Sequence, residues 1–172
     1  EILQTVKDAG FDGADLPGDP ERMNGKQWRQ AVDAVGLEVP EVLGAWAYYH
    51  GGENRDLAGP DREVRRRGIE YAKKTIDLAE EVGAQFVEVC APQPPIAQVP
   101  FPELPIKTLR KNFLESLKEI CEHAADRITI VFEPLNYYEA YPGVLTTIHE
   151  AINLVNELDN LGFSNTGIQP DI

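Results

Sequence analysis

The chain has 172 residues, enough for one domain with a substantial core and too few for two. Its hydrophobic content of 42% is typical of a folded globular protein, and no apolar run approaches the roughly 18 residues of a membrane span. The net charge of −13 argues against a nucleic-acid partner, because proteins hold phosphate backbones with Lys and Arg.

Helices and strands are predicted to alternate along the whole chain. Apolar residues recur at helical spacing in five segments, and β-branched or aromatic residues mark five others. The expected helices cover residues 1–10, 26–35, 61–82, 109–124 and 147–158. The expected strands cover residues 11–16, 39–46, 84–90, 127–133 and 165–172. Connections of these lengths favour parallel crossovers, so the pattern predicts an α/β fold.

The first two strands bring candidate site residues to one face. Phe11, Gly13 and Asp15 are expected to share a strand face, and Trp46 is expected on the face of Asp15. The polar and aromatic loop 47–60 that follows has the length of a functional loop. Trp46 and His50 would suit the wall of a sugar site, although for His50 an ordinary loop residue is slightly favoured over a substrate contact.

The next strand has one β-branched face and one acidic face. Val87 and Val89 face one way, whereas Glu88 and Cys90 face the other. Both Cys90 and Cys121 lie among apolar residues and are expected to be buried free thiols, which points to a reducing, cytoplasmic compartment. The proline-rich segment 92–107 that follows is expected to be irregular, either as a spacer or as a rigid lid.

The strand over residues 127–133 carries the strongest candidate for chemistry. Ile130 and Phe132 share an apolar face, and Thr129 and Val131 share the other face with Glu133. A strand-end carboxylate either reaches solvent or takes part in a site, because an unpaired buried charge is costly. We favour a metal ligand or an acid/base residue. The last strand likewise ends near an acid, Asp171.

Acidic residues near the C-terminal ends of successive strands are typical of the active-site rim of a (β/α)8 TIM barrel. The sequence contains neither of the glycine-rich phosphate-binding patterns of nucleotide-binding α/β folds. We therefore predict a single partial TIM-barrel domain over residues 1–172. A complete barrel has about 250 residues, so about three of its eight strands are expected to lie outside this chain.

Three motifs resemble those of the sugar isomerase/epimerase family with a xylose-isomerase-like TIM barrel, which includes ketose 3-epimerases and hydroxypyruvate isomerases. The segment E-P-L-N-Y-Y-E at residues 133–139 resembles the fifth-strand signature of the family. Residues 10–15, G-F-D-G-A-D, resemble its second strand, and residues 167–171, G-I-Q-P-D, its sixth. The long helix near residues 66–83 is similar to its third helix. The resemblance covers strands two to six.

The resemblance implies a role for each matching residue. Glu133 would be a metal ligand and the catalytic acid/base, Asp171 a second ligand, and Glu139 a contact to a substrate hydroxyl. The remaining ligands of the family, a His and a Glu from strands seven and eight, have no counterpart in this chain. Tyr137 replaces the usual Arg, and Pro170 precedes Asp171 where proline is unusual for an inner strand.

The implied activity is a divalent-metal-dependent isomerisation or epimerisation of a sugar or hydroxy-keto acid through an enediolate. Carboxylate ligands suit Mn²⁺ or Mg²⁺, and a histidine would extend the choice to Co²⁺ or Zn²⁺. Glu88 and Asp15 are weaker candidates for the site. A metal-dependent abasic-site nuclease and a non-catalytic barrel fragment acting as a binding module remain as alternatives. A homo-oligomer is compatible with the sequence, and the chain by itself is expected to be inactive.

Overall fold

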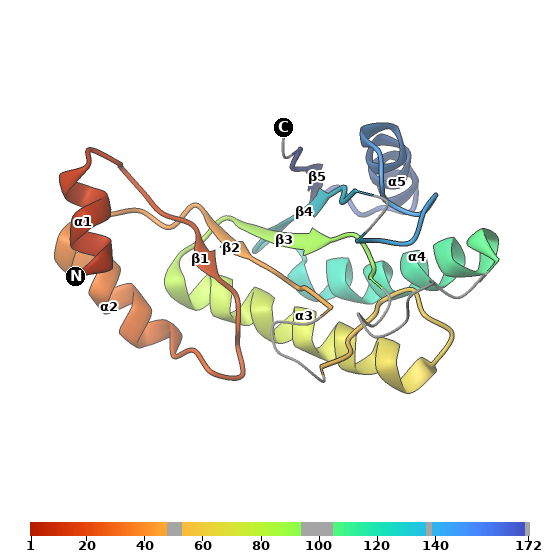
Figure 1. The fold of residues 1–172 in the computed structure, drawn as a ribbon, viewed down its shortest axis with the longest axis horizontal. Helices are drawn as coiled ribbons and strands as arrows, with labels where there is room; N and C mark the ends of the chain where they lie inside the picture. Colours follow the sequence, from red (N-terminus) through yellow and green to blue (C-terminus); the bar gives the residue numbers. More distant parts are fainter. Residues whose placement is uncertain (48–52, 94–104, 137–138, 171–172) are drawn as a thin grey trace.

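Five parallel strands form one sheet in the computed structural model, which describes residues 1–47, 53–93, 105–136 and 139–170. The strands follow one another across the sheet in the order of the sequence, as in the wall of a barrel (Figure 1). Their bounds are β1 Leu16–Pro17, β2 Glu41–Leu43, β3 Phe86–Cys90, β4 Thr129–Glu133 and β5 Thr166–Ile168. The predicted α/β class and partial TIM-barrel architecture are confirmed.

One helix precedes each strand along the chain. Their bounds are α1 Ile2–Asp8, α2 Gly25–Val35, α3 Arg62–Val82, α4 Ile106–Ala124 and α5 Ile148–Asn160. The helix α2 ends at Gly36, which adopts a left-handed conformation with φ of 68°. A capping box starts α5, because the Thr147 side chain accepts a hydrogen bond from the Glu150 backbone N–H and the Glu150 side chain accepts one from the Thr147 backbone N–H.

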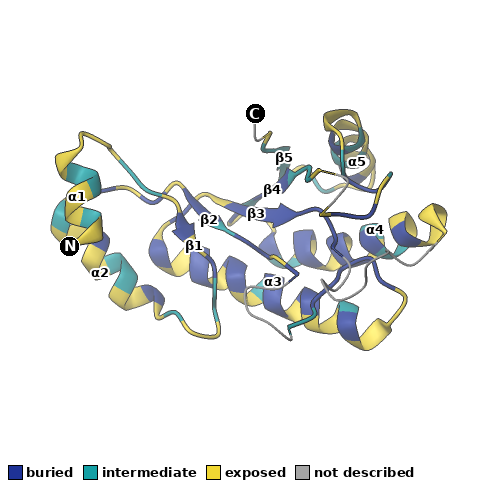
Figure 2. Cartoon of the chain, viewed as in Figure 1, coloured by how far each residue is buried: buried dark blue, intermediate teal, exposed yellow. Residues whose placement is uncertain are grey.

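The hydrophobic core lies between the sheet and the helices that cover one of its faces. In Figure 1, α3 and α4 run beneath the sheet, and Figure 2 shows that their sheet-facing sides are buried. Val87, Val89, Ile130 and Phe132 are fully buried on this side of β3 and β4. Burying each such side chain contributes about 1.5 to 3 kcal/mol, so the two apolar faces fix the register of the central strands. The predicted division of faces on β3 and β4 is confirmed.

The prediction for the first strand is wrong. Residues 11–16 were expected to form it, but β1 is only Leu16–Pro17, and Gly13 forms an isolated bridge with Glu38. Phe11 is 61% exposed and lies outside β1, so the expected shared strand face of Phe11, Gly13 and Asp15 does not form. Pro40 supplies no N–H to this edge of the sheet, and the pairing between β1 and β2 is therefore short.

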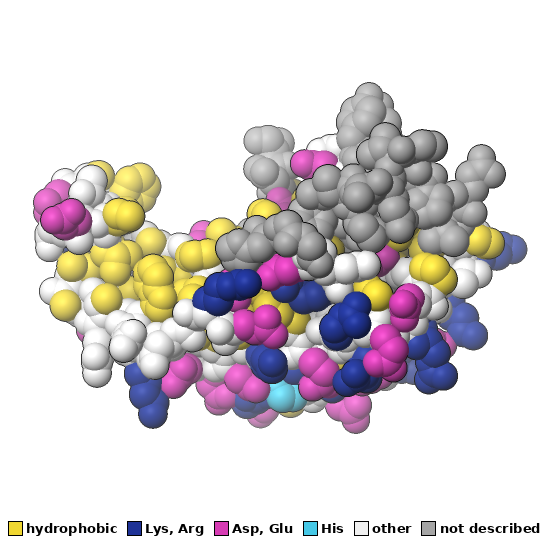
Figure 3. All heavy atoms as spheres, turned by 60° about the horizontal axis from the view of Figure 1, so that its bottom comes forward, with side chains coloured by type: hydrophobic (Ala, Val, Ile, Leu, Met, Phe, Trp, Pro, Cys, Tyr) yellow, Lys and Arg dark blue, Asp and Glu magenta, His cyan; other side chains and the backbone are white. Residues whose placement is uncertain are grey.

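The outer surface of the helices is polar. Figure 3 shows acidic and basic side chains interspersed along this side, and ion pairs such as Arg66–Glu63 and Lys73–Glu70 join neighbours on α3. The arginines of α3 therefore belong to a helix face of mixed charge rather than to a basic patch. No helix in the described part of the chain is both long enough and apolar enough to cross a membrane.

Candidate active site

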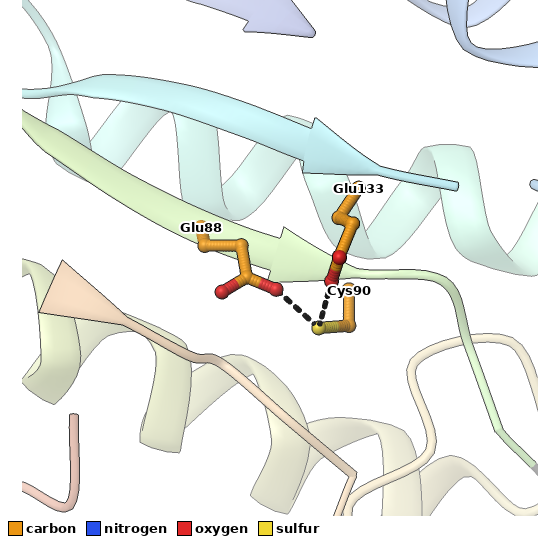
Figure 4. Close-up of side chains that lie close together, drawn as sticks. All are labelled: Glu88, Cys90 and Glu133. Carbon is orange, nitrogen blue, oxygen red and sulfur yellow. Dashed lines mark hydrogen bonds between the residues drawn. The ribbon is translucent and has the colours of Figure 1, made fainter. Parts of the chain in front are cut away.

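Three side chains from β3 and β4 meet on the face of the sheet opposite the core. Cys90 and Glu133 are register partners, which places their side chains side by side at the C-terminal ends of the two strands. The Cys90 Sγ lies 2.6 Å from Glu88 Oε1 and 3.4 Å from Glu133 Oε2 (Figure 4). One potential ligand atom from each residue lies within 4.8 Å of the other two.

The cluster is well removed from bulk water. Glu88 is 2% exposed and Cys90 is 3% exposed, whereas Glu133 is half-buried. Burial, reinforced by the neighbouring Glu133 carboxylate, raises the pKa of Glu88 to about 8. Burial also raises the pKa of the Cys90 thiol, and the carboxylates of Glu88 and Glu133 raise it further. Burial and the neighbouring carboxylate therefore favour the protonated form of Glu88.

The cluster opens into a cavity of about 470 Å³. Trp46 forms part of its wall, and the Trp46 Nε1 donates a hydrogen bond of 3.2 Å to Glu88 Oε1. The residues that line the cavity are Leu43, Trp46, Glu88, Cys90, Gln93, Glu133, Leu135, Glu139, Gln169 and Pro170. The cavity therefore combines carboxylates and amides with aromatic and aliphatic surface, as sites for small polar ligands do.

A second buried acid, Glu41 on β2, was missed by the sequence analysis. It is the register partner of Phe86, so it shares the inner face with Glu88 two residues further along β3. Glu41 is 8% exposed, and within the described residues its Oε1 makes no hydrogen bond. Burial first, and then repulsion from Asp15 and Glu133, raise the pKa of Glu41 to about 7. Asp15 itself is exposed.

The alternation of faces along β2 explains why Glu41 was overlooked. A strict alternation along residues 39–46 would place Leu43 and Trp46 on opposite faces, yet both line the cavity. Gly44 lies between them with φ of 106°, a conformation that glycine adopts readily, and it resets the alternation. Glu41 and Leu43 before this glycine, and Trp46 after it, therefore all face inward.

Comparison with known proteins identifies the fold family. The sequence profile of the xylose isomerase-like TIM barrel matches residues 3–172. The chain belongs to this family. It is similar to the L-ribulose-5-phosphate 3-epimerase UlaE of Escherichia coli O139:H28, with 27% identity over 184 residues that cover all of this chain and 58% of that protein. The chain thus spans less than two thirds of the curated relatives that it matches.

Solved structures of sugar epimerases share the fold. The 3-keto-D-glucoside 4-epimerase YcjR from E. coli superimposes with a TM-score of 0.80 at 23% identity, over 98% of this chain and 61% of that one. An L-ribulose 3-epimerase gives a TM-score of 0.77 at 24% identity, over 99% of this chain and 53% of that one. The family resemblance drawn from the three sequence motifs is confirmed by the family match over residues 3–172.

In this xylose isomerase-like chain, the structure brings together most of the residues predicted for the site. Glu133, Glu88, Trp46 and Glu139 all line the cavity. The Asn136 side chain donates a hydrogen bond to the Glu139 carboxylate. His50 and Asp171 lie outside the described residues, as does Tyr137, so their predicted roles stay predictions.

The residues present fit a divalent cation. Glu88 and Glu133 offer oxygen ligands within 4.8 Å of each other, and their carboxylates repel each other when both are ionised. Glu41, with one oxygen that makes no hydrogen bond within the described residues, adds a third acid to the same face. A bound cation relieves this repulsion, which is the reason that acidic clusters of this kind bind Mg²⁺, Mn²⁺ or related ions.

The segment 53–59 supports the Trp46 wall. The Arg55 backbone N–H donates to Ala47 O at 2.9 Å, and the Arg55 Nε donates to Trp46 O at 3.2 Å. Next to it, the buried Asp56 accepts hydrogen bonds from the Tyr141 hydroxyl at 2.7 Å and from the Ala58 N–H at 2.9 Å. The Asp56–Tyr141 bond joins the loop after β2 to the loop after β4. The Arg55 bonds fix the backbone at Trp46, whose ring bonds to Glu88.

Proposed function

We propose that this protein is a divalent-metal-dependent sugar epimerase or isomerase that moves a proton next to a carbonyl group. The observation that carries the proposal is the Glu133 carboxylate, which stands at the C-terminal end of β4 in a cavity with aromatic, carboxylate and amide walls. The names of the relatives support it, because an L-ribulose-5-phosphate 3-epimerase and several other sugar epimerases share this fold.

Glu133 is the proposed proton acceptor. A C–H bond beside a carbonyl is weakly acidic, and a positioned carboxylate typically contributes about 10² to 10⁴ in rate to its cleavage. Glu133 is half-buried and opens to the cavity, so it can reach a bound substrate while most bulk water is excluded. Neighbouring Cys90 and Glu88 restrict the positions of its carboxylate.

Other residues of the cavity are proposed to bind the sugar. Trp46 offers an apolar ring face for the carbon skeleton, while Glu139 and Gln169 can accept or donate hydrogen bonds to hydroxyl groups. The Trp46 ring N–H donates a hydrogen bond to Glu88, and the Arg55 side chain donates one to the Trp46 backbone carbonyl. These two bonds fix the position of Trp46. Binding of this kind orients the reacting C–H bond toward Glu133.

Glu133, together with Glu88 and the predicted ligand Asp171, is proposed to hold the cation. When bound, a divalent cation supplies positive charge for the substrate oxygen that becomes negative as the proton leaves. On carboxylate ligands alone, Mn²⁺ or Mg²⁺ is the expected ion. The substrate is thus a small sugar or sugar-like molecule, and the acidic chain is not expected to bind nucleic acid.

The test is conversion of candidate ketoses, free and phosphorylated, by the full-length protein with Mn²⁺ and with a chelator. We expect one ketose to be converted to its epimer or isomer, and we expect the chelator to stop the conversion. The Glu133→Gln variant should lose activity by about 10²-fold or more while keeping its circular dichroism spectrum. Glu122→Gln, which changes an exposed acid on α4, is the matched control and should retain full activity. Full turnover by Glu133→Gln would refute the assignment.

A further inference from the structure

Cys90 faces the cavity rather than the core between the sheet and the helices. Its chain neighbours Val89 and Ala91 are buried, as Cys90 is, but of these three only Cys90 lines the cavity, together with Glu88 and Glu133. Its sulfur lies between the two carboxylates, and Figure 4 shows all three side chains converging from β3 and β4. A thiol that only fills core volume does not need two acidic neighbours.

The spacing of sulfur and oxygen agrees with joint coordination of one ion. In a tetrahedral site, a thiolate at about 2.3 Å and a carboxylate at about 2.0 Å from the metal lie about 3.5 Å apart. The Cys90 Sγ and Glu133 Oε2 are 3.4 Å apart. The Glu88 oxygen, at 2.6 Å from the sulfur, must move away by a small side-chain rotation to become a third ligand.

A separate observation on β2 also indicates a cation at this face. The buried Glu41 keeps one carboxylate oxygen without a hydrogen bond within the described residues. Its carboxyl group is close enough to Glu133 for their charges to interact, and it also contacts Gln169 of the cavity wall. A buried polar atom left unsatisfied costs about 1 to 3 kcal/mol, a cost that a nearby positive ion reduces.

We propose that Cys90 binds the cation directly as a thiolate, so that the site prefers the thiophilic ions Zn²⁺ and Co²⁺ over Mg²⁺. The inference rests on the metal site of the proposed function and specifies its selectivity. Coordination forms a metal–sulfur bond and releases the thiol proton to solvent, with no change of oxidation state. Soft thiolate ligands favour Zn²⁺ and Co²⁺, whereas Mg²⁺ requires oxygen ligands and gains nothing from sulfur.

The second cysteine provides a matched control. Cys121 is a free, buried thiol on α4 that belongs to the hydrophobic core. Only burial raises its pKa, since no charged group contributes. Replacing Cys121 removes a thiol from the protein without changing the carboxylate cluster.

The experiment is a Co²⁺ titration of the full-length protein followed by absorption spectroscopy. Wild-type protein and Cys121→Ser should develop a sulfur-to-cobalt charge-transfer band at one ion per chain, and Cys90→Ser should not. The ratio of Zn²⁺ to Mg²⁺ affinity should fall by at least about tenfold in Cys90→Ser, with Mg²⁺ affinity nearly unchanged. An unaltered band or an unaltered affinity ratio in Cys90→Ser would overturn the proposal.

A second measurement avoids dependence on the folding of the Cys90 variant. X-ray absorption of Zn²⁺-loaded Cys121→Ser should show a sulfur neighbour at about 2.3 Å. If the zinc ion has oxygen and nitrogen neighbours but no sulfur neighbour, the thiolate assignment is wrong, even if the protein epimerises a sugar. Conversely, a sulfur-to-cobalt charge-transfer band that depends on Cys90, in a protein that converts none of the sugars, would support the thiolate site and refute the proposed function.

Discussion

Replacing Glu41 by Gln should make the protein more stable at high pH and leave its stability at low pH almost unchanged. The buried carboxyl of Glu41 has a pKa of about 7 in the folded state, against 4.5 for an ordinary glutamate. The folded state therefore binds a proton more tightly than the unfolded state does. The stability that this proton confers is complete below pH 4.5 and is lost as the pH rises through 7.

The expected size follows from that difference in pKa. A rise from 4.5 to about 7 corresponds to at most about 3 kcal/mol of unfolding free energy between low and high pH. Glutamine has nearly the same shape and no charge, so Glu41→Gln should gain up to this amount over wild type at pH 8.

Urea unfolding of the full-length protein at pH 4, 6 and 8, in the presence of a chelator, measures this directly. Glu38→Gln, at an exposed position three residues earlier, is the control and should show little pH-dependent difference from wild type. If the difference between Glu41→Gln and wild type stays constant from pH 4 to pH 8, the reasoning about Glu41 is wrong.

Two further predictions concern stability. Tyr141→Phe should lower the unfolding free energy by about 1 to 3 kcal/mol, because the buried Asp56 loses the hydroxyl that donates to it at 2.7 Å; an unchanged urea midpoint would contradict this. Phe132→Ala should cost about 3 to 5 kcal/mol, because Phe132 is fully buried in the core. Phe86→Ala, at a position that is 36% exposed, should cost clearly less, and equal losses of thermal stability in the two variants would contradict the assigned faces of the sheet.

The central strands could be predicted because their sequences are unambiguous. Residues 86–90 place Val87 and Val89 opposite Glu88 and Cys90, and residues 129–133 are β-branched or aromatic until Glu133. A one-residue shift would expose Val87 or Phe132. Helix ends were equally readable, since Gly36 and the pair Thr147 and Glu150 are specific stop and start signals.

The edge of the sheet could not be predicted in the same way. Proline residues and a glycine with positive φ at position 44 interrupt the alternation near β1 and β2, so Phe11 was assigned to a strand and Glu41 was overlooked. The meeting of Cys90 with Glu133 depends on strand register between segments 43 residues apart. The sequence showed that Cys90 and Glu88 share a face, and only the three-dimensional pairing showed which acid stands beside them.

Deuterium uptake from solvent tests the central claim most directly. Full-length protein in D₂O with a divalent cation should incorporate deuterium at the carbon next to the carbonyl of its ketose, as followed by proton NMR. The account predicts that Glu133→Gln abolishes this uptake while Glu122→Gln leaves it intact. Epimer formation without any deuterium incorporation, or undiminished uptake by Glu133→Gln, would contradict it.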